Sequence, residues 1–158
     1  MPLGISVMIA FLIAISLFEK FGSSQVEIPS SSPTPYVFTM IRPVDNWNYT
    51  RIFCKEHEAI DMIDNEGGLN IYAVADGQVI LVSSVINGYG NRIEIKHENG
   101  FISTYSHLSR VLVKKGQEVI AGSVIGLMGK TGDATGVHLH FELIDEGVKI
   151  NPETYFAD

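Results

Sequence analysis

The stretch R-I-E-I-K-H at residues 92–97 alternates polar and apolar side chains with a period of two residues. The turn residues Glu98-Asn99-Gly100 follow it and lead into a second run, F-I-S-T-Y, at residues 101–105. Successive side chains of a β-strand point to opposite faces, so this alternation is typical of a strand. Residues 92–105 therefore predict two strands joined by a short turn.

Short runs of the same kind lie on both sides of this stretch, separated by glycine-containing turns, at residues 71–75, 78–82, 111–113, 118–120, 124–128 and 138–144. The first two flank Asp76-Gly77, a dipeptide typical of hairpin turns. No segment outside the N-terminus shows the sustained 3.6-residue apolar period of a helix. We predict an all-β fold, a compact antiparallel β-sheet or sandwich with glycine-rich hairpins.

The N-terminal segment differs from the rest of the chain. Residues 2–18 carry no charged side chain, and their number lies near the lower limit of about 17 for a membrane-spanning helix. We predict an apolar helix over residues 1–20 that is a membrane anchor or a signal segment, with a buried helix of the domain as the alternative. Residues 21–40, rich in Ser and Pro, predict a linker, and residues 41–158 the folded domain.

Composition excludes several classes of protein. The 158 residues carry a formal net charge of −7, with eleven Lys and Arg against eighteen Asp and Glu. Binding to nucleic acid through phosphate neutralisation needs the opposite balance, so we predict no nucleic-acid partner. Cys54 is the only cysteine, which rules out an intramolecular disulfide and a cysteine-based metal cluster.

Histidines supply the candidate chemistry. His138 and His140 lie two residues apart in the strand-like run V-H-L-H-F-E-L, so their imidazoles project from one face. His57 and Asp61 lie four residues apart and share a face in extended backbone. His107 follows another predicted strand. The alternative is that an amphipathic strand simply exposes polar residues at every second position, and that Asp61 is a turn or surface carboxylate.

Histidine and aspartate ligands together with a water would make a catalytic zinc site, because the open fourth position distinguishes it from a structural one. Manganese, cobalt and nickel also accept such ligands. A bound metal polarises a carbonyl group and lowers the pKa of its water to about 7. Histidines that are not ligands can then move protons or stabilise an oxyanion.

Several spaced motifs in this chain resemble the lysostaphin-type zinc metallopeptidases. They are His57-x-x-x-Asp61, A-V-A-D-G-Q-V at 73–79, G-Y-G-N-R-I-E-I-K-H at 88–97, T-Y-S-H-L at 104–108, V-K-K-G-Q-E-V-I-A-G at 113–122, I-G-L-M-G-K-T-G-D-A-T-G at 125–136, H-L-H-F-E at 138–142 and Asn151-Pro152. The resemblance covers residues 50–156. It implies that residues 41–158 form a metallopeptidase catalytic domain.

The resemblance also implies a role for each histidine. His57, Asp61 and His140 match the ligands of one Zn²⁺ ion, and His107 and His138 match the catalytic pair beside the metal water. His97 matches a structural position that faces a cross-strand neighbour. Members of the family hydrolyse peptide bonds in peptidoglycan stems or bridges, which makes peptidoglycan the expected partner.

Some positions depart from the pattern of the family. Ala59 replaces a usual glycine, Val137 a usual proline, and Leu69-Asn70 a frequent Thr-Pro. None of these changes removes a ligand, and Ala59 would be unfavourable only at a positive φ.

Three other features have competing interpretations. The Gly129-Lys130-Thr131 run is not a phosphate-binding loop, because position 124 is valine, and we expect it to shape a groove wall. We interpret Cys54 as a bystander. Tyr89, Phe101 and Tyr105 line a groove or belong to the core.

We therefore expect a zinc-dependent endopeptidase acting on peptidoglycan, located outside the cytoplasm and held to a membrane through residues 1–18 if these are not cleaved. The alternative is a non-hydrolytic module that activates other wall hydrolases, because some relatives have lost their metal ligands. A cytosolic sugar-transport phosphocarrier shares the glycine-rich hairpins, but the apolar N-terminus and the H-L-H pair argue against it.

Overall fold

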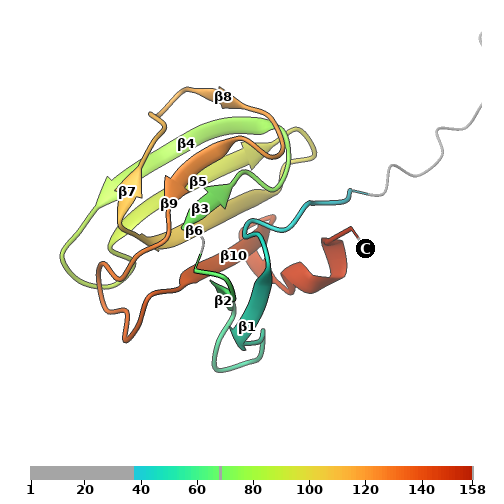
Figure 1. The fold of residues 1–158 in the computed structure, drawn as a ribbon. Coiled ribbons are helices and arrows are strands. Elements are labelled where there is room, and N and C mark those ends of the chain that lie inside the picture. The colour runs from blue at the N-terminus through green and yellow to red at the C-terminus, as the bar shows by residue number, and fades with distance from the viewer. Residues whose placement is uncertain (1–37, 68, 158) are drawn as a thin grey trace, which may run out of the picture. The chain divides into compact units, whose positions relative to one another are not determined.

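The computed structural model describes residues 38–67 and 69–157. These residues form an eight-stranded sheet and a three-stranded sheet, and the smaller sheet covers one face of the larger one (Figure 1). All pairings within the two sheets are antiparallel. The predicted all-β, antiparallel fold is confirmed. The N-terminal helix that the sequence predicts lies outside the described residues.

The larger sheet has the strand order β1-β2-β10-β6-β5-β4-β8, and β11 pairs with β10. Its strands are β1 (Trp47–Arg51), β2 (Ile60–Asp64), β4 (Gly77–Ser84), β5 (Asn91–His97), β6 (Ile102–Leu108), β8 (Glu118–Val119), β10 (Leu139–Asp145) and β11 (Val148–Ile150). The smaller sheet has the order β3-β9-β7, with β3 (Asn70–Tyr72), β7 (Arg110–Val111) and β9 (Val124–Leu127). A 3-10 helix, η1 (Pro152–Tyr155), follows β11.

The hairpin of β5 and β6 forms where the alternating sequence predicts it. Ile93 and Ile95 are fully buried, while Glu94 between them faces away from the core. Gly100 closes the turn at φ +92°, a conformation that favours glycine, and its amide donates to the carbonyl oxygen of His97 at 3.0 Å.

The core lies between the two sheets. Ile71 of β3 and Ile125 of β9 are fully buried, as are Ile93 and Leu108 on the facing strands of the larger sheet. The layers approach closely at Gly126 of β9, where a Cβ atom would lie 3.1 Å from Cδ1 of Leu108 and 3.6 Å from Cδ1 of Ile93. Burial of each such aliphatic side chain stabilises the fold by roughly 1.5–3 kcal/mol.

The hairpin predicted around Asp76-Gly77 is wrong. Residues on its two sides belong to different sheets, because β3 pairs with β9 whereas β4 pairs with β5 and β8. Gly77 has no positive φ, and a Cβ there would lie 2.4 Å from the carbonyl oxygen of Lys96. Glycine therefore serves close packing here, and the Asp76 carboxylate accepts from the Ala121 amide at 2.8 Å. The dipeptide marks a crossover between sheets instead of a tight turn.

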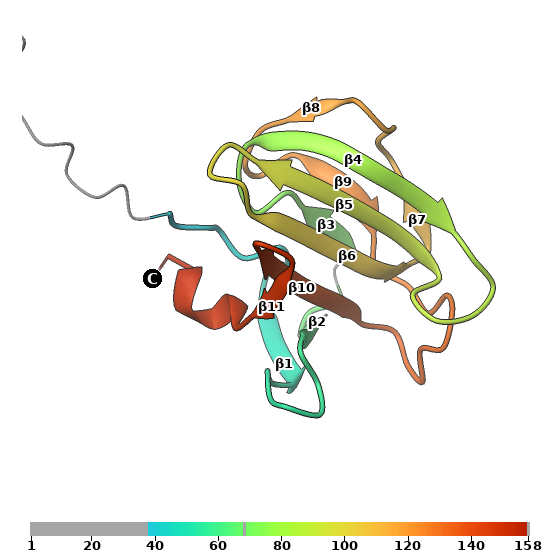
Figure 2. The ribbon, with the colours of Figure 1, turned by 180° about the vertical axis from the view of Figure 1, so that it is seen from behind.

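Two strands that sequence alternation did not reveal, β1 and β2, extend the larger sheet beyond β10 (Figure 2). The start and the end of the described chain also meet, because Met40 is buried in the core and pairs with Phe156. Among residues 38–67 and 69–157, no helix has the length and apolar character needed to cross a membrane.

Candidate metal centre and active-site groove

Strand β10 divides its side chains between the core and the site. Leu139, Phe141 and Leu143 are fully buried on the core face, whereas His140 and Glu142 point to the opposite face. The antiparallel register places His140 directly opposite Asp61 of β2. A residue 79 positions earlier in the sequence is thereby brought beside the H-L-H motif.

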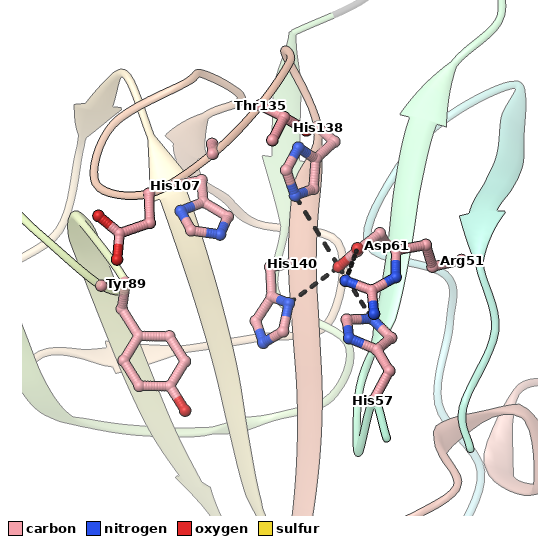
Figure 3. Close-up of a pocket in the computed structure, with 11 residues that line it drawn as sticks. Arg51, His57, Asp61, Tyr89, His107, Thr135, His138 and His140 are labelled. Carbon is pink, nitrogen blue, oxygen red and sulfur yellow. Dashed lines mark hydrogen bonds and ion pairs between the residues drawn. The ribbon is translucent and has the colours of Figure 1, made fainter. Parts of the chain in front are cut away.

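Three of the predicted site residues meet at one point. The Asp61 Oδ1 atom lies 3.2 Å from Nε2 of His57 and 2.8 Å from Nδ1 of His140. One donor atom from each residue lies within 4.8 Å of the other two (Figure 3). His57 is placed by a backbone bridge in which it and Cys54 exchange two hydrogen bonds of 3.0 Å.

The donor set fits a metal ion. The Nε2 atom of His57 is buried and makes no aligned hydrogen bond, not even to Asp61 Oδ1 at 3.2 Å, although a buried polar atom is normally satisfied. A metal ligated at this atom would satisfy it. Two imidazoles and one carboxylate are a usual set for a catalytic zinc site, which retains a further open position.

Burial and hydrogen bonds tune the charges of the three donors. Burial lowers the pKa of His57, which favours the neutral imidazole that can ligate. Burial would raise the pKa of Asp61, but the hydrogen bond and charge of His140 hold it below its usual value. Burial would lower the pKa of His140, but its hydrogen bonds to Asp61 and Glu142 raise it.

His107 and His138 complete the cluster from a second direction. Their ring centroids lie 4.9 Å apart, and the His107 ring lies 5.6 Å from that of His140. The Nδ1 atom of His107 is 2.8 Å from the Thr131 carbonyl oxygen, and that of His138 is 3.0 Å from the Gly136 carbonyl oxygen. A carbonyl oxygen only accepts, so each Nδ1 carries a proton, and Nε2 is the nitrogen of each ring that can accept one.

The environment of His107 suits a proton acceptor. Burial lowers its pKa below the usual histidine value, with partial compensation by the Thr131 carbonyl, so the ring is neutral near pH 7. Its backbone has φ +62°, a conformation that costs a non-glycine residue of order 1–3 kcal/mol and that is concentrated at functional sites.

A groove surrounds the five side chains. One cavity is lined by all five together with Arg51, Tyr89 and residues 133–135 (Figure 3). The glycine-rich stretch thus forms one wall, as the sequence predicts. It rests on residues 88–90, because a Cβ atom at Gly132 would lie 2.2 Å from the Gly88 carbonyl oxygen. Neighbouring cavities adjoin the site at Val137 on one side and at Lys149 on the other.

A family model described as Peptidase family M23 matches residues 55–152, which is more than half of the chain. The chain belongs to peptidase family M23. The resemblance to lysostaphin-type peptidases is confirmed.

The relatives of the M23 domain include proteins whose names state two different functions, activator and endopeptidase. The domain is 40% identical over 99 residues to the murein hydrolase activator NlpD of Escherichia coli, covering 63% of this chain and 26% of NlpD. It is 46% identical over 85 residues to the peptidoglycan DD-endopeptidase ShyA of Vibrio cholerae, covering 53% of this chain and 19% of ShyA. This chain therefore spans about a quarter or less of these relatives.

Among solved structures, a zinc-containing peptidase from Vibrio cholerae matches the M23 domain with a TM-score of 0.67 and 32% identity. The match covers 76% of this chain and 40% of that one. The His57, Asp61 and His140 cluster is thus a candidate metal site in a domain whose structural relative contains zinc.

The structure also places the other residues that the sequence analysis discussed. His97 stands apart from the cluster, with Nε2 at 2.8 Å from Ser103 Oγ and Nδ1 at 2.8 Å from the Asp76 carbonyl oxygen. Ala59 is buried and has no positive φ, so its methyl group is tolerated. Tyr89 lines the groove, whereas Tyr105 is a core residue.

Sequence analysis missed three polar residues of the site. Arg51 places Nη1 3.7 Å from Asp61 Oδ2, and no local pattern indicated it. Glu142 contacts His140, and its position two residues after His140 on the same strand could have revealed it. Lys149 contacts Glu142 across the hairpin of β10 and β11.

Proposed function

We propose that this chain is a zinc-dependent endopeptidase that hydrolyses peptide bonds in the stem peptides or cross-bridges of bacterial peptidoglycan. The observation that carries the proposal is the convergence of His57, Asp61 and His140, with an unpartnered buried nitrogen among them, beside two further imidazoles in one groove. The names of ShyA and NlpD point to peptidoglycan as the substrate.

His57, Asp61 and His140 would hold one zinc ion, which when bound supplies Lewis acidity and a water of lowered pKa. Hydrolysis needs a group that takes a proton from water and a group that returns one to the leaving amine. Nε2 of His107 or His138 can do both. Once protonated, either ring carries a positive charge that stabilises the oxygen of the attacked carbonyl.

A non-hydrolytic activator of other wall hydrolases is the second candidate, favoured by the similarity to NlpD. It needs no metal ligands, whereas all five residues implied by the family resemblance meet in this groove. We therefore favour the hydrolase.

An extracytoplasmic location fits both candidates, because the names of relatives include lipoproteins. We propose that residues 1–20 direct export and that residues 1–18 anchor the chain if they are retained. An alkaline phosphatase fused after residue 158 is active only outside the cytoplasm. Equal phosphatase activity with and without residues 1–20 would contradict this role.

Mass spectrometry of peptidoglycan digests tests the hydrolase directly. The zinc-loaded full chain is incubated with purified peptidoglycan beside its His138→Ala variant, and released peptides are sequenced. New peptide termini from the wild type alone establish an endopeptidase and identify the bond. A folded, zinc-bound chain that releases nothing from walls with different cross-links supports the activator instead.

A further inference from the structure

The second ring nitrogen of His140 contacts a buried carboxylate. Nδ1 of His140 faces Asp61 at 2.8 Å, while Nε2 lies 3.0 Å from Oε1 of Glu142. An imidazole ligates a metal through one nitrogen, and the partner of the other nitrogen decides which one is free. Glu142 lies on the far side of the ring from the metal cluster, so it is a partner of the ligand and not a ligand itself.

The same oxygen of Glu142 accepts two more hydrogen bonds. The Tyr89 hydroxyl donates to Oε1 at 2.9 Å, and Nζ of Lys149 donates to it at 2.7 Å. Lys149 also donates to the Tyr89 hydroxyl at 3.1 Å, which closes the network. Because the Glu142 side chain is only 4% exposed, its charge needs this compensation.

The β10–β11 hairpin explains how Lys149 reaches this carboxylate. Glu146 and Gly147 form a two-residue turn in which both have positive φ, as a type I′ hairpin turn requires. The turn sets a register that places Lys149 opposite Ile144. Ile144 and Glu142 are two residues apart on β10 and share a face, so Lys149 lies beside Glu142.

We propose that Glu142 is a positioning residue that holds the Nε2–H of His140, so that Nδ1 is the nitrogen presented to the metal, and that Lys149 and Tyr89 hold the carboxylate in place. This inference rests on the metal site of the proposed function. It does not depend on which bond is cut, or on whether any bond is cut.

A purely structural role is the competing explanation, because a buried ion pair also contributes to folding. The chain offers a matched control in Glu94. Thr104 pairs with Glu142 on one side and with Glu94 on the other, so both glutamates lie on the same sheet face. Glu94 pairs with Arg92 at 3.4 Å and contacts no histidine.

The test compares Glu142→Gln, Glu142→Leu and Glu94→Gln in the full chain by competition for zinc with a chelator. We expect the zinc Kd to rise about 10-fold for Glu142→Gln and about 100-fold for Glu142→Leu, the range found for partners of ligating histidines. Glu94→Gln should leave the Kd unchanged. Thermal unfolding of the metal-free variants reports stability separately.

A spectroscopic readout addresses His140 itself. In ¹⁵N-detected NMR of the zinc-loaded protein, we expect a protected Nε2–H signal from His140 that is lost in Glu142→Leu and retained in Glu94→Gln. A lowered Tm with an unchanged zinc Kd and an unchanged Nε2–H signal would overturn the inference in favour of a structural role. If Glu142→Leu does not fold, Glu142→Gln decides by the same criteria.

The outcome is distinguishable from that of the proposed function. A wild-type chain that binds zinc but releases no peptides refutes the hydrolase, while the Kd of the variants still tests Glu142. A wild-type chain that binds no zinc refutes both.

Discussion

The two groups of histidines in the groove are supported by different parts of the molecule. His57 and His140 face side-chain carboxylates; the pairing of β2 with β10 places His140 beside Asp61, and the backbone bridge to Cys54 places His57. His107 and His138 instead contact backbone carbonyl oxygens of Thr131 and Gly136, which lie in the glycine-rich wall. The proposed metal binding and the proposed proton transfer thus have separate supports, so we expect substitutions that remove one and leave the other.

The largest effect is expected from His140→Ala. Loss of a central donor should abolish both stoichiometric zinc binding and peptide release, because two ligands remain. Zinc content after dialysis is measured by atomic absorption. His97→Gln is the control, since His97 is a buried histidine outside the cluster and should leave zinc content unchanged. Full zinc occupancy in His140→Ala would mean that the ligand set is wrong.

His107→Ala and His138→Ala should separate the two functions. Each should keep one zinc per chain and reduce kcat by roughly 10²–10⁴-fold, as is typical of acid–base groups. Zinc analysis and rates of peptide release are measured on the same preparations. A metal-free His107→Ala protein would show that a ligand had been mistaken for a proton carrier.

Gly132→Ala should distort the glycine-rich wall that supports His107 and His138, while both histidines remain present. Gly132 has φ +70°, and a Cβ atom would meet the Gly88 carbonyl oxygen at 2.2 Å, so the wall must shift. We expect zinc binding to persist and kcat to fall roughly 10- to 10²-fold through misplacement of His107 and His138. Gly136→Ala, where a Cβ has open space and φ is not positive, is the matched control. A rate for Gly132→Ala equal to that of the wild type would contradict a supporting role for the glycine-rich wall.

His97 lies outside both groups of histidines, and we expect it to affect only the stability of the fold. Its substitution should have the smallest effect of the four. Burial lowers its pKa below 6.5 in the folded state. Above that pH both states are neutral, but as the pH falls the unfolded chain binds a proton that the folded chain excludes. The wild type should therefore lose free energy of unfolding below pH 6.5 more steeply than His97→Gln. Urea denaturation between neutral and acidic pH measures the free energy of unfolding of both proteins. An equal fall of this free energy with pH in the two proteins would contradict a lowered pKa of His97.

Much of the fold was accessible from local patterns. The alternation in residues 92–105 located β5 and β6, and H-L-H-F-E located β10 together with the face that carries its histidines. Family motifs supplied the roles proposed for the site residues. By contrast, β1 and β2 were missed, and Asp76-Gly77 was assigned to a hairpin although its flanking strands belong to different sheets.

By itself, the sequence determined that β5, β6 and β10 are strands and which of their side chains share a face, because the two-residue period of a strand depends only on local backbone geometry. Tertiary structure alone decided that Asp61 lies opposite His140 and that the glycine-rich wall supports His107 and His138. These neighbours are chosen by the packing of the whole core and by the register of distant strands, and no local pattern encodes either.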